Sequence, residues 1–150
     1  MDKFINYSHN PDDSTTLSAG DPQSKAMYLD RFNRLWIGTY GGGVNRLDLK
    51  QINNLNPETA VFDHFYNNPN DIQSPSSDLI ISLAGSREDD KDVLWLGSFN
   101  GGLTRLQYHF EGKQEVYSYK RYSEAEGLCD NVIFGIEVDR RNALWLSTGD

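Results

Sequence analysis

The sequence lacks the residues that would place it in several common classes of protein. Cys129 is its only cysteine, so the chain can form neither an internal disulfide nor a zinc site of the multi-cysteine kind. Lysine and arginine number 14 against 22 aspartates and glutamates, and no basic patch suited to nucleic-acid phosphates is visible. The same shortage of positive charge disfavours binding to an anionic membrane surface.

Long apolar runs are also missing. No stretch approaches the roughly 18 apolar residues of a transmembrane helix. Residues 1–6 are polar and do not resemble a secretory signal peptide. No segment shows a convincing helical period. The sequence is instead rich in tyrosine, phenylalanine and tryptophan, at 12% of its residues, and in glycine-containing turn sequences. This composition favours short strands joined by turns.

One segment recurs three times and organises the chain. Residues 35–47 (LWIGTYGGGVNRL) match residues 94–106 (LWLGSFNGGLTRL) position for position, and residues 144–150 (LWLSTGD) begin a third copy. Trp36 and Trp95 are 59 residues apart, and the third tryptophan follows 50 residues later. Periods of this size are typical of stacked supersecondary units.

Each unit is predicted to contain four short antiparallel strands. In the first unit these are residues 26–29, 35–39, 44–49 and 60–66, and the second unit repeats them at 79–83, 94–98, 103–107 and 116–122. The Leu-Trp strand is apolar at successive positions, so both of its faces must be covered. Stacked four-stranded sheets meet that need. We therefore predict an all-β fold, a partial β-propeller of about two and a half four-stranded antiparallel blades.

The domain boundaries follow from the repeat. Residues 1–24 are predicted to hold an outer strand of a preceding blade plus a link, because the order of residues 4–13 returns at 62–71. A blade (25–66), a link (67–78), a second blade (79–122) and the start of a third, incomplete blade (123–150) follow. Polar connections are expected within the blades at 51–58, where Asn53 and Asn54 suit a loop, at 86–92 and at 108–114.

The repeat resembles a known family. The pattern Asp30-x-x-Asn33-x-Leu-Trp-Ile-Gly-Thr, followed by Gly-Gly-Val-Asn-Arg-Leu, is similar to the two-component regulator propeller repeat. Asp139-x-x-Asn142-x-Leu-Trp-Leu-Ser-Thr fits the same pattern, and residues 127–133 resemble the loop before a blade's first strand. The resemblance implies the sensory propeller of a hybrid two-component or diguanylate-cyclase-linked sensor. It also implies a periplasmic location in the parent protein and, often, a carbohydrate signal.

The meander places candidate binding residues on one rim. The turns after the Leu-Trp strands share that rim with the links between blades, whereas the turns at 30–34 and the connections at 51–58 and 108–114 lie on the opposite rim. Tyr40 and Phe99 occupy equivalent turn positions, where an exposed aromatic ring can stack on a sugar face. Asn and Asp side chains of this rim can hydrogen-bond hydroxyl groups. The ligand-binding candidates are Tyr40, Phe99, Asn100, Asn68, Asp71 and Asn131.

Structural readings compete with these assignments. Tyr40 and Phe99 could simply pack on the adjoining blade, and Trp36, Trp95 and Trp145 are predicted to be core rather than binding residues. Gly41–Gly43 are followed by neither a helix nor a Lys-Ser/Thr pair, so a hairpin turn is expected there and not a phosphate cradle. The Asn-Pro clusters lack a calcium-loop pattern. No cofactor, metal site or catalytic residue is expected.

Three functional hypotheses remain. The first is a non-enzymatic sensory or ligand-binding propeller segment of a bacterial signal-transduction protein, with an oligosaccharide as candidate ligand. The second is a piece of a propeller glycosidase or lyase whose acid and base lie outside this chain. The third is a protein-interaction scaffold. Two and a half blades cannot close a ring, so we expect the exposed blade faces to meet the remaining blades or to self-associate.

Overall fold

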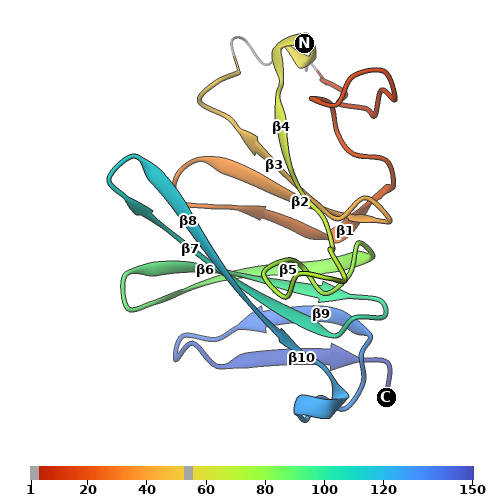
Figure 1. Ribbon diagram of the computed structural model, residues 1–150, viewed down its shortest axis with the longest axis vertical. Helices are drawn as coiled ribbons and strands as arrows, with labels where there is room; N and C mark the ends of the chain where they lie inside the picture. The colour runs from red at the N-terminus through yellow and green to blue at the C-terminus, as the bar shows by residue number, and fades with distance from the viewer. Residues whose placement is uncertain (1–3, 53–55) are drawn as a thin grey trace.

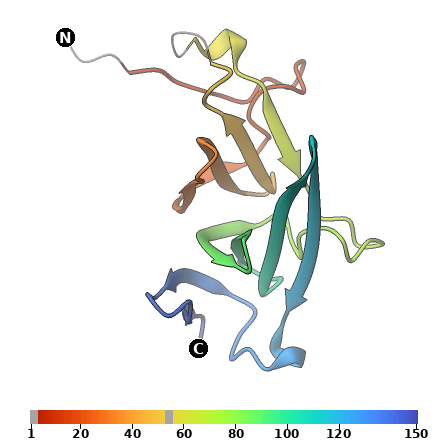
Figure 2. The same cartoon turned by 90° about the vertical axis from the view of Figure 1, so that its left-hand side faces the viewer.

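The computed structural model describes residues 4–52 and 56–150. Ten strands form three antiparallel sheets that are stacked one on another (Figures 1 and 2). The first sheet holds β1 (Asp21–Leu29), β2 (Arg34–Tyr40), β3 (Val44–Asp48) and β4 (Phe62–Phe65) in sequence order. The second holds β5 (Ile80–Glu88), β6 (Lys91–Ser98), β7 (Leu103–Glu111) and β8 (Gln114–Tyr122). The third pairs β9 (Ile133–Val138) with β10 (Leu144–Thr148).

This arrangement is the predicted partial propeller, and the predicted all-β fold class is confirmed. The sheets approach each other most closely through their first strands, β1, β5 and β9. Two 3-10 turns, η2 (Pro57–Thr59) and η3 (Glu124–Glu126), complete the described elements. Neither they nor any other helix of the described residues has the length and apolarity to cross a bilayer.

An aspartate builds the turn before β2. Asp30 Oδ1 accepts hydrogen bonds from the backbone N–H groups of Phe32 and Arg34, at 2.9 and 3.0 Å. Its other oxygen accepts the indole N–H of Trp36 at 3.0 Å. Asn33 takes the left-handed conformation, with φ of 64°, that a short polar side chain tolerates. The Asp-x-x-Asn-x-Leu-Trp spacing therefore fixes the conformation of the turn and the position of the tryptophan ring through local hydrogen bonds.

The third sheet has the same aspartate-centred turn, whereas the second sheet has a hairpin in its place. Asp139 accepts the backbone N–H groups of Arg141 and Ala143 and the indole N–H of Trp145. In the second sheet β5 and β6 continue into a tight hairpin, and Trp95 donates to Ser86 Oγ at 3.0 Å instead. The altered spacing of the middle repeat thus changes the partner of the indole but keeps the tryptophan in register.

Two predicted connections are wrong. Residues 86–92 and 108–114 were expected to be polar loops, but they lie mostly in strands that meet at two-residue turns. Most of the polar residues there are at least partly exposed near the ends of the two hairpins, although Asp92 is buried and pairs with Arg31, so polarity alone did not mark a loop. The strand predicted at 26–29 also begins earlier, at Asp21. Of the predicted 51–58 loop, Asn53 and Asn54 lie outside the described residues.

The glycine of the Leu-Trp-Ile-Gly motif has a packing reason. A Cβ on Gly38 would collide with Ala26 and with Ile80 of the next sheet, and a Cβ on Gly97 would collide with Ser82 and Ile133. The first strand of each following sheet therefore packs directly on this position. The third copy carries a serine at this position, Ser147.

The tryptophans differ in burial. Trp36 is fully buried, with its ring 5.1 Å from Phe65 and 5.4 Å from Tyr108 of the next sheet, measured between centroids. Trp95 is 7% exposed and lies in the cluster covered by β9 and β10. Trp145 is 62% exposed among the residues that the structure describes, and its assignment to the core stays a prediction. It lies on a sheet face that no described residue covers.

The N-terminal segment lies over the other end of the stack. Leu17 packs with Leu47 and Phe62, and Phe62 N–H donates to the carbonyl of Thr15 at 2.8 Å. Residues 4–7, which the repeat aligned with β4, form no strand within the described part of the chain. Their assignment to a preceding blade stays a prediction.

Candidate functional site

The turn after the second strand is built identically in the first two sheets. Thr39 Oγ1 accepts the N–H of Gly42 and donates to the carbonyl of Gly43, both at 3.1 Å. Ser98 makes the equivalent pair of bonds. Gly43 has φ of 66°, which a side chain would strain. The buried hydroxyl thus holds the turn and leaves the preceding aromatic residue to project from it.

The two turn aromatics meet. The Tyr40 and Phe99 rings lie edge to face with centroids 5.5 Å apart, and they are 39% and 42% exposed. They therefore pack on one another across two sheets and still present ring surface to solvent. Both readings of these residues, blade-to-blade packing and an accessible aromatic surface, describe part of the geometry.

Irregular strand pairing brings further side chains to the same place. In β5 the register shifts between Ile80 and Ser82, which leaves Ile81 as the extra residue of a bulge. Phe134 is the extra residue of the corresponding bulge in β9. In β1 the shift spans Pro22 to Met27 and contains Lys25. Bulges re-aim side chains and recur beside binding sites.

These residues line one cavity of about 470 Å³, which we call the rim pocket. The aromatic and aliphatic wall comes from three successive sheets. The first strand of the chain adds polar groups at one side. The lining residues are Gln23, Ser24, Lys25, Tyr40, Ile81, Phe99 and Phe134. A concave apolar wall with a few polar groups is the usual make-up of a small-molecule site.

The predicted polar candidates do not join the rim pocket. Asn100 neighbours Phe99, but its Oδ1 accepts a hydrogen bond from Ser77 Oγ at 2.7 Å. Asn131 bonds to the backbone and carboxylate of Glu124. These amides hold their own turns in place, so they contribute to the loop structure and not to the cavity lining.

Asn68 and Asp71 lie farther out, on the link to β5. Their side chains accept N–H groups of the same link, from Asn70 and Gln73, and Arg121 of the outer strand β8 donates to the carbonyl of Asp71. These two residues were predicted on the same rim as Tyr40, but they lie far from it because the link reaches the outer edge of the sheet. Sequence reasoning missed Lys25, Ile81 and Phe134, since only the bulges reveal their direction.

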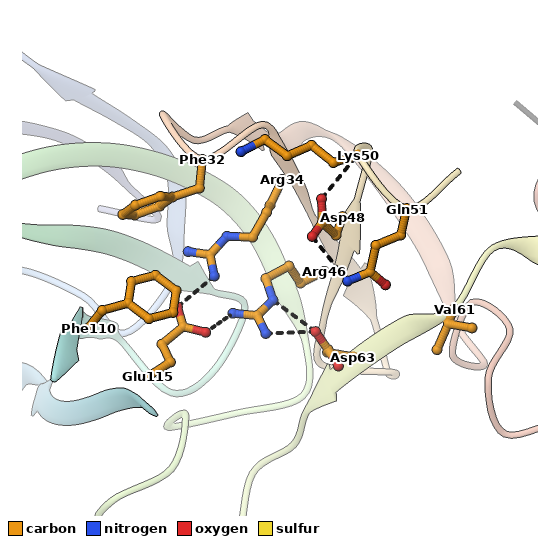
Figure 3. Close-up of a pocket in the computed structure, with 10 residues that line it drawn as sticks. All are labelled: Phe32, Arg34, Arg46, Asp48, Lys50, Gln51, Val61, Asp63, Phe110 and Glu115. Atoms are coloured by element: carbon orange, nitrogen blue, oxygen red, sulfur yellow. Dashed lines mark hydrogen bonds and ion pairs between the residues drawn. The ribbon is translucent and has the colours of Figure 1, made fainter. Parts of the chain in front are cut away.

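A second cavity lies between the first two sheets on the opposite rim, and we call it the interblade pocket (Figure 3). Its volume is about 330 Å³. Both sheets contribute charged side chains, and aromatic and aliphatic side chains close its sides. The lining residues are Phe32, Arg34, Arg46, Asp48, Lys50, Gln51, Val61, Asp63, Phe110 and Glu115.

Glu115 is the centre of the ion network in this pocket. One of its oxygens accepts from Arg34 Nη1 at 2.6 Å, and the other accepts from Arg46 Nη1 at 2.8 Å and from the Tyr117 hydroxyl at 2.6 Å. Arg34 also binds Asp30 at 2.8 Å, and Arg46 binds Asp63 at 2.7 Å. The network joins the first sheet to the hairpin of β7 and β8.

The environment shifts the ionisation of these groups. Burial opposes the charge of Glu115, but the hydrogen bond from Tyr117 and both arginines outweigh it and lower the pKa of the carboxyl overall. Burial and the bond to Glu115 raise the pKa of Tyr117 to about 12. Burial also works against the charge of Arg46, yet its bonds and neighbouring charges raise the pKa further. The ions are therefore fixed in their charged forms near neutral pH.

Comparison with known protein families finds a match at the N-terminal end of the first sheet. Residues 18–41 match the family described as two component regulator propeller. The resemblance read from the sequence is confirmed there. This stretch contains the end of the N-terminal segment, β1, the Asp30 turn, β2 and Tyr40. It includes one of the two turn aromatics of the rim pocket.

Comparison with solved structures supports the fold. The chain is similar to the extracellular domain assigned to the hybrid two component system BT3049 from B. thetaiotaomicron, with a TM-score of 0.65 and 24% sequence identity. The likeness covers 100% of this chain but only 17% of that one. Among curated proteins no match was found.

Proposed function

We propose that this chain is a non-enzymatic, ligand-binding propeller segment of a signal-transduction protein that acts outside the cytoplasm. Support comes from the regulator propeller match at residues 18–41 and from the likeness to an extracellular domain of a two component system. In this proposal the transmitting domain belongs to other parts of the parent protein. The segment supplies recognition.

The ligand we propose for the rim pocket is carbohydrate. The observation that carries this is the joining of Tyr40, Phe99 and Phe134, from three sheets, into one partly exposed aromatic wall beside polar groups. The apolar face of a sugar ring packs on such a wall, and the hydroxyl groups reach the side chains of Gln23 and Ser24.

Hydrolysis or elimination at this pocket is not favoured by its lining. A glycosidase of the common type needs two carboxyl groups flanking the scissile bond. Among the residues that the structure describes, the rim pocket is lined by no aspartate or glutamate. Binding without turnover is therefore the function that this cavity supports best.

A glycan array probed with the 150-residue chain tests the proposal. Binding to a defined subset of glycans, lost in Tyr40→Ala, is the expected result. Tyr66→Ala is a matched control, because Tyr66 is similarly exposed at 50% but lies outside the rim pocket. An array without any positive glycan, or equal loss in both variants, would contradict carbohydrate recognition at this site.

A further inference from the structure

The interblade pocket has acidic groups that are already engaged. Glu115 accepts from two arginines and a tyrosine, and Asp63 accepts from Arg46. Asp48 accepts from the side chain of Gln51 at 3.2 Å and from the backbone N–H of Lys50 at 2.9 Å. None of the three carboxylates needs a cationic ligand.

Two donors on the same pocket have no such partner. Arg34 is held by Asp30 and Glu115, but its Nη2 is buried and has no hydrogen-bond partner, which is costly for a charged donor. Figure 3 shows this nitrogen directed toward Phe32 and Phe110, at the side of the pocket. Lys50 extends along another edge toward Phe32, and its ammonium forms no ion pair with any residue that the structure describes.

The two unpaired donors, on Arg34 and Lys50, define which chemical group a ligand needs. The charge of Arg34 is already compensated by two carboxylates, so Arg34 offers hydrogen bonds, whereas Lys50 offers an uncompensated positive charge. A group that accepts several hydrogen bonds and carries one negative charge satisfies both, and a carboxylate is the simplest such group.

The remaining walls define the body of the ligand. Phe32 and Phe110 lie edge to face with centroids 5.3 Å apart, and Val61 is 55% exposed on another side. Phe110 is itself 46% exposed at the edge of the pocket, and we expect its ring to turn aside and uncover Arg34 Nη2 when a ligand binds. A volume of about 330 Å³ accommodates one ring and its carboxylate, but not an extended chain.

We propose that the interblade pocket binds a small ring-bearing carboxylate, with the carboxylate between Lys50 and Arg34 and the ring against Phe32, Phe110 and Val61. The site is separate from the rim pocket and does not depend on carbohydrate binding there. Because its walls come from two sheets, the ligand would hold the β7–β8 hairpin against the first sheet.

Titration of the 150-residue chain with benzoate, and with benzamide as its uncharged counterpart, tests this proposal by NMR. The indole N–H of Trp36 is a local reporter, since it donates to the Asp30 carboxylate that also holds Arg34. We expect saturable benzoate shifts at Trp36 and none at Trp145. Benzamide should bind at least about tenfold more weakly, since a charged hydrogen bond contributes that much.

Two lysine variants locate the effect. Lys50→Met should weaken benzoate binding about tenfold or more, and Lys50→Arg should restore most of it. Lys120→Met is the matched control, because Lys120 is an exposed lysine of β8 that lines neither the interblade pocket nor the rim pocket, and it should leave benzoate affinity unchanged. Absence of saturable benzoate binding, equal affinity for benzamide, or equal loss in the two methionine variants would overturn the proposal.

Discussion

The repeated tryptophan is expected to contribute differently to the free energy of unfolding in different repeats. Trp36 and Trp145 both donate their indole N–H to the aspartate six residues before them, yet the first is fully buried and the second is 62% exposed. The hydrogen bond is local and forms in both repeats. Burial depends on whether another sheet covers the ring, so it cannot be read from the motif.

Alanine substitution separates these two contributions. Trp36→Ala should lower the free energy of unfolding by about 3–5 kcal/mol, because a fully buried aromatic side chain leaves a cavity. Trp145→Ala should lower it by less than about 1 kcal/mol, since most of the ring already contacts water. Urea denaturation followed by circular dichroism measures both. Equal destabilisation would show that the third sheet packs differently.

Acid should weaken the interblade ion network. The pKa of Glu115 is lowered in the folded chain, because Tyr117, Arg34 and Arg46 together outweigh the effect of burial. A carboxyl with a lowered folded pKa contributes stability above its unfolded value of about 4.3, and that stability is lost as pH falls toward the folded pKa. Glu115→Gln should therefore be less stable than wild type at pH 7. The difference in the free energy of unfolding between the two proteins should become smaller below about pH 4.3.

Thermal unfolding between pH 3 and pH 7 checks this. Glu137→Gln is the control, because Glu137 is an exposed glutamate of β9 outside the network. Its unfolding profile should run parallel to that of wild type. Parallel profiles for wild type and Glu115→Gln would mean that Glu115 is not held as an ion by its arginines.

At the scale of elements, the hairpins are held by their turn residues. Asp89 and Asp90, between β5 and β6, both have positive φ, at 46° and 65°. This is the pattern of a type I′ turn, which favours glycine at its second position. Between β7 and β8 the positive φ falls on Gly112, at 63°, where no strain arises.

Substitutions at Asp90 and Gly112 should change the free energy of unfolding in opposite directions. Asp90→Gly should stabilise the chain by roughly 0.5–1 kcal/mol, because it relieves a left-handed aspartate next to other acids. Its ion pair with Arg87, at 3.6 Å on the surface, contributes little to oppose this gain. Gly112→Ala should destabilise by a similar amount. Midpoints of chemical denaturation give the comparison, and a loss of stability in Asp90→Gly would refute the turn assignment.

The elements show which features the sequence could predict. The strands around Trp36, Trp95 and Trp145 and the turns at Asp30 and Asp139 are local, so spacing and residue type were sufficient. The Tyr40 and Phe99 pair followed from the repeat, because equivalent turns of adjacent sheets must lie together.

Other features depend on pairing between distant segments. A one-residue register shift in β9 creates a bulge, and this bulge sets the direction of the Phe134 side chain. The residue types in β9 do not predict where that shift occurs. The bonds of Glu115 to Arg34 and Arg46 span 81 and 69 residues, and they exist only because one sheet stacks on another. These non-local features define both cavities, which is why the sequence predicted the fold better than the sites.

At the scale of the whole molecule, the two ends of the stack differ. Leu17 and the neighbouring N-terminal segment cover part of the first sheet, although Met27 and Leu29 remain 54% exposed. On the third sheet Trp145 and Phe134 are exposed, and no described residue packs over Trp145. The uncovered face of β9 and β10 that carries Trp145 is therefore the stronger candidate for contact with another blade or another copy.

This face should drive self-association of the isolated chain. We expect the mass measured by light scattering to rise with protein concentration, because the large exposed rings of Trp145 and Phe134 are unfavourable in water. Trp145→Lys should reduce that rise. Ile72→Lys is the control, since Ile72 is 74% exposed on a link away from this face. A stable monomer at all concentrations would contradict this expectation.

Ligand recognition at the rim pocket is the central claim, and calorimetric titration with an oligosaccharide selected on the glycan array tests it most directly. Wild type, Phe99→Ala and Trp145→Ala are compared at one protein concentration. The account predicts saturable binding that Phe99→Ala weakens about tenfold, since partial burial of the ring by the ligand is worth about 1.4 kcal/mol. Trp145→Ala should leave the affinity unchanged. Binding that survives Phe99→Ala, or that is lost with Trp145, would contradict it.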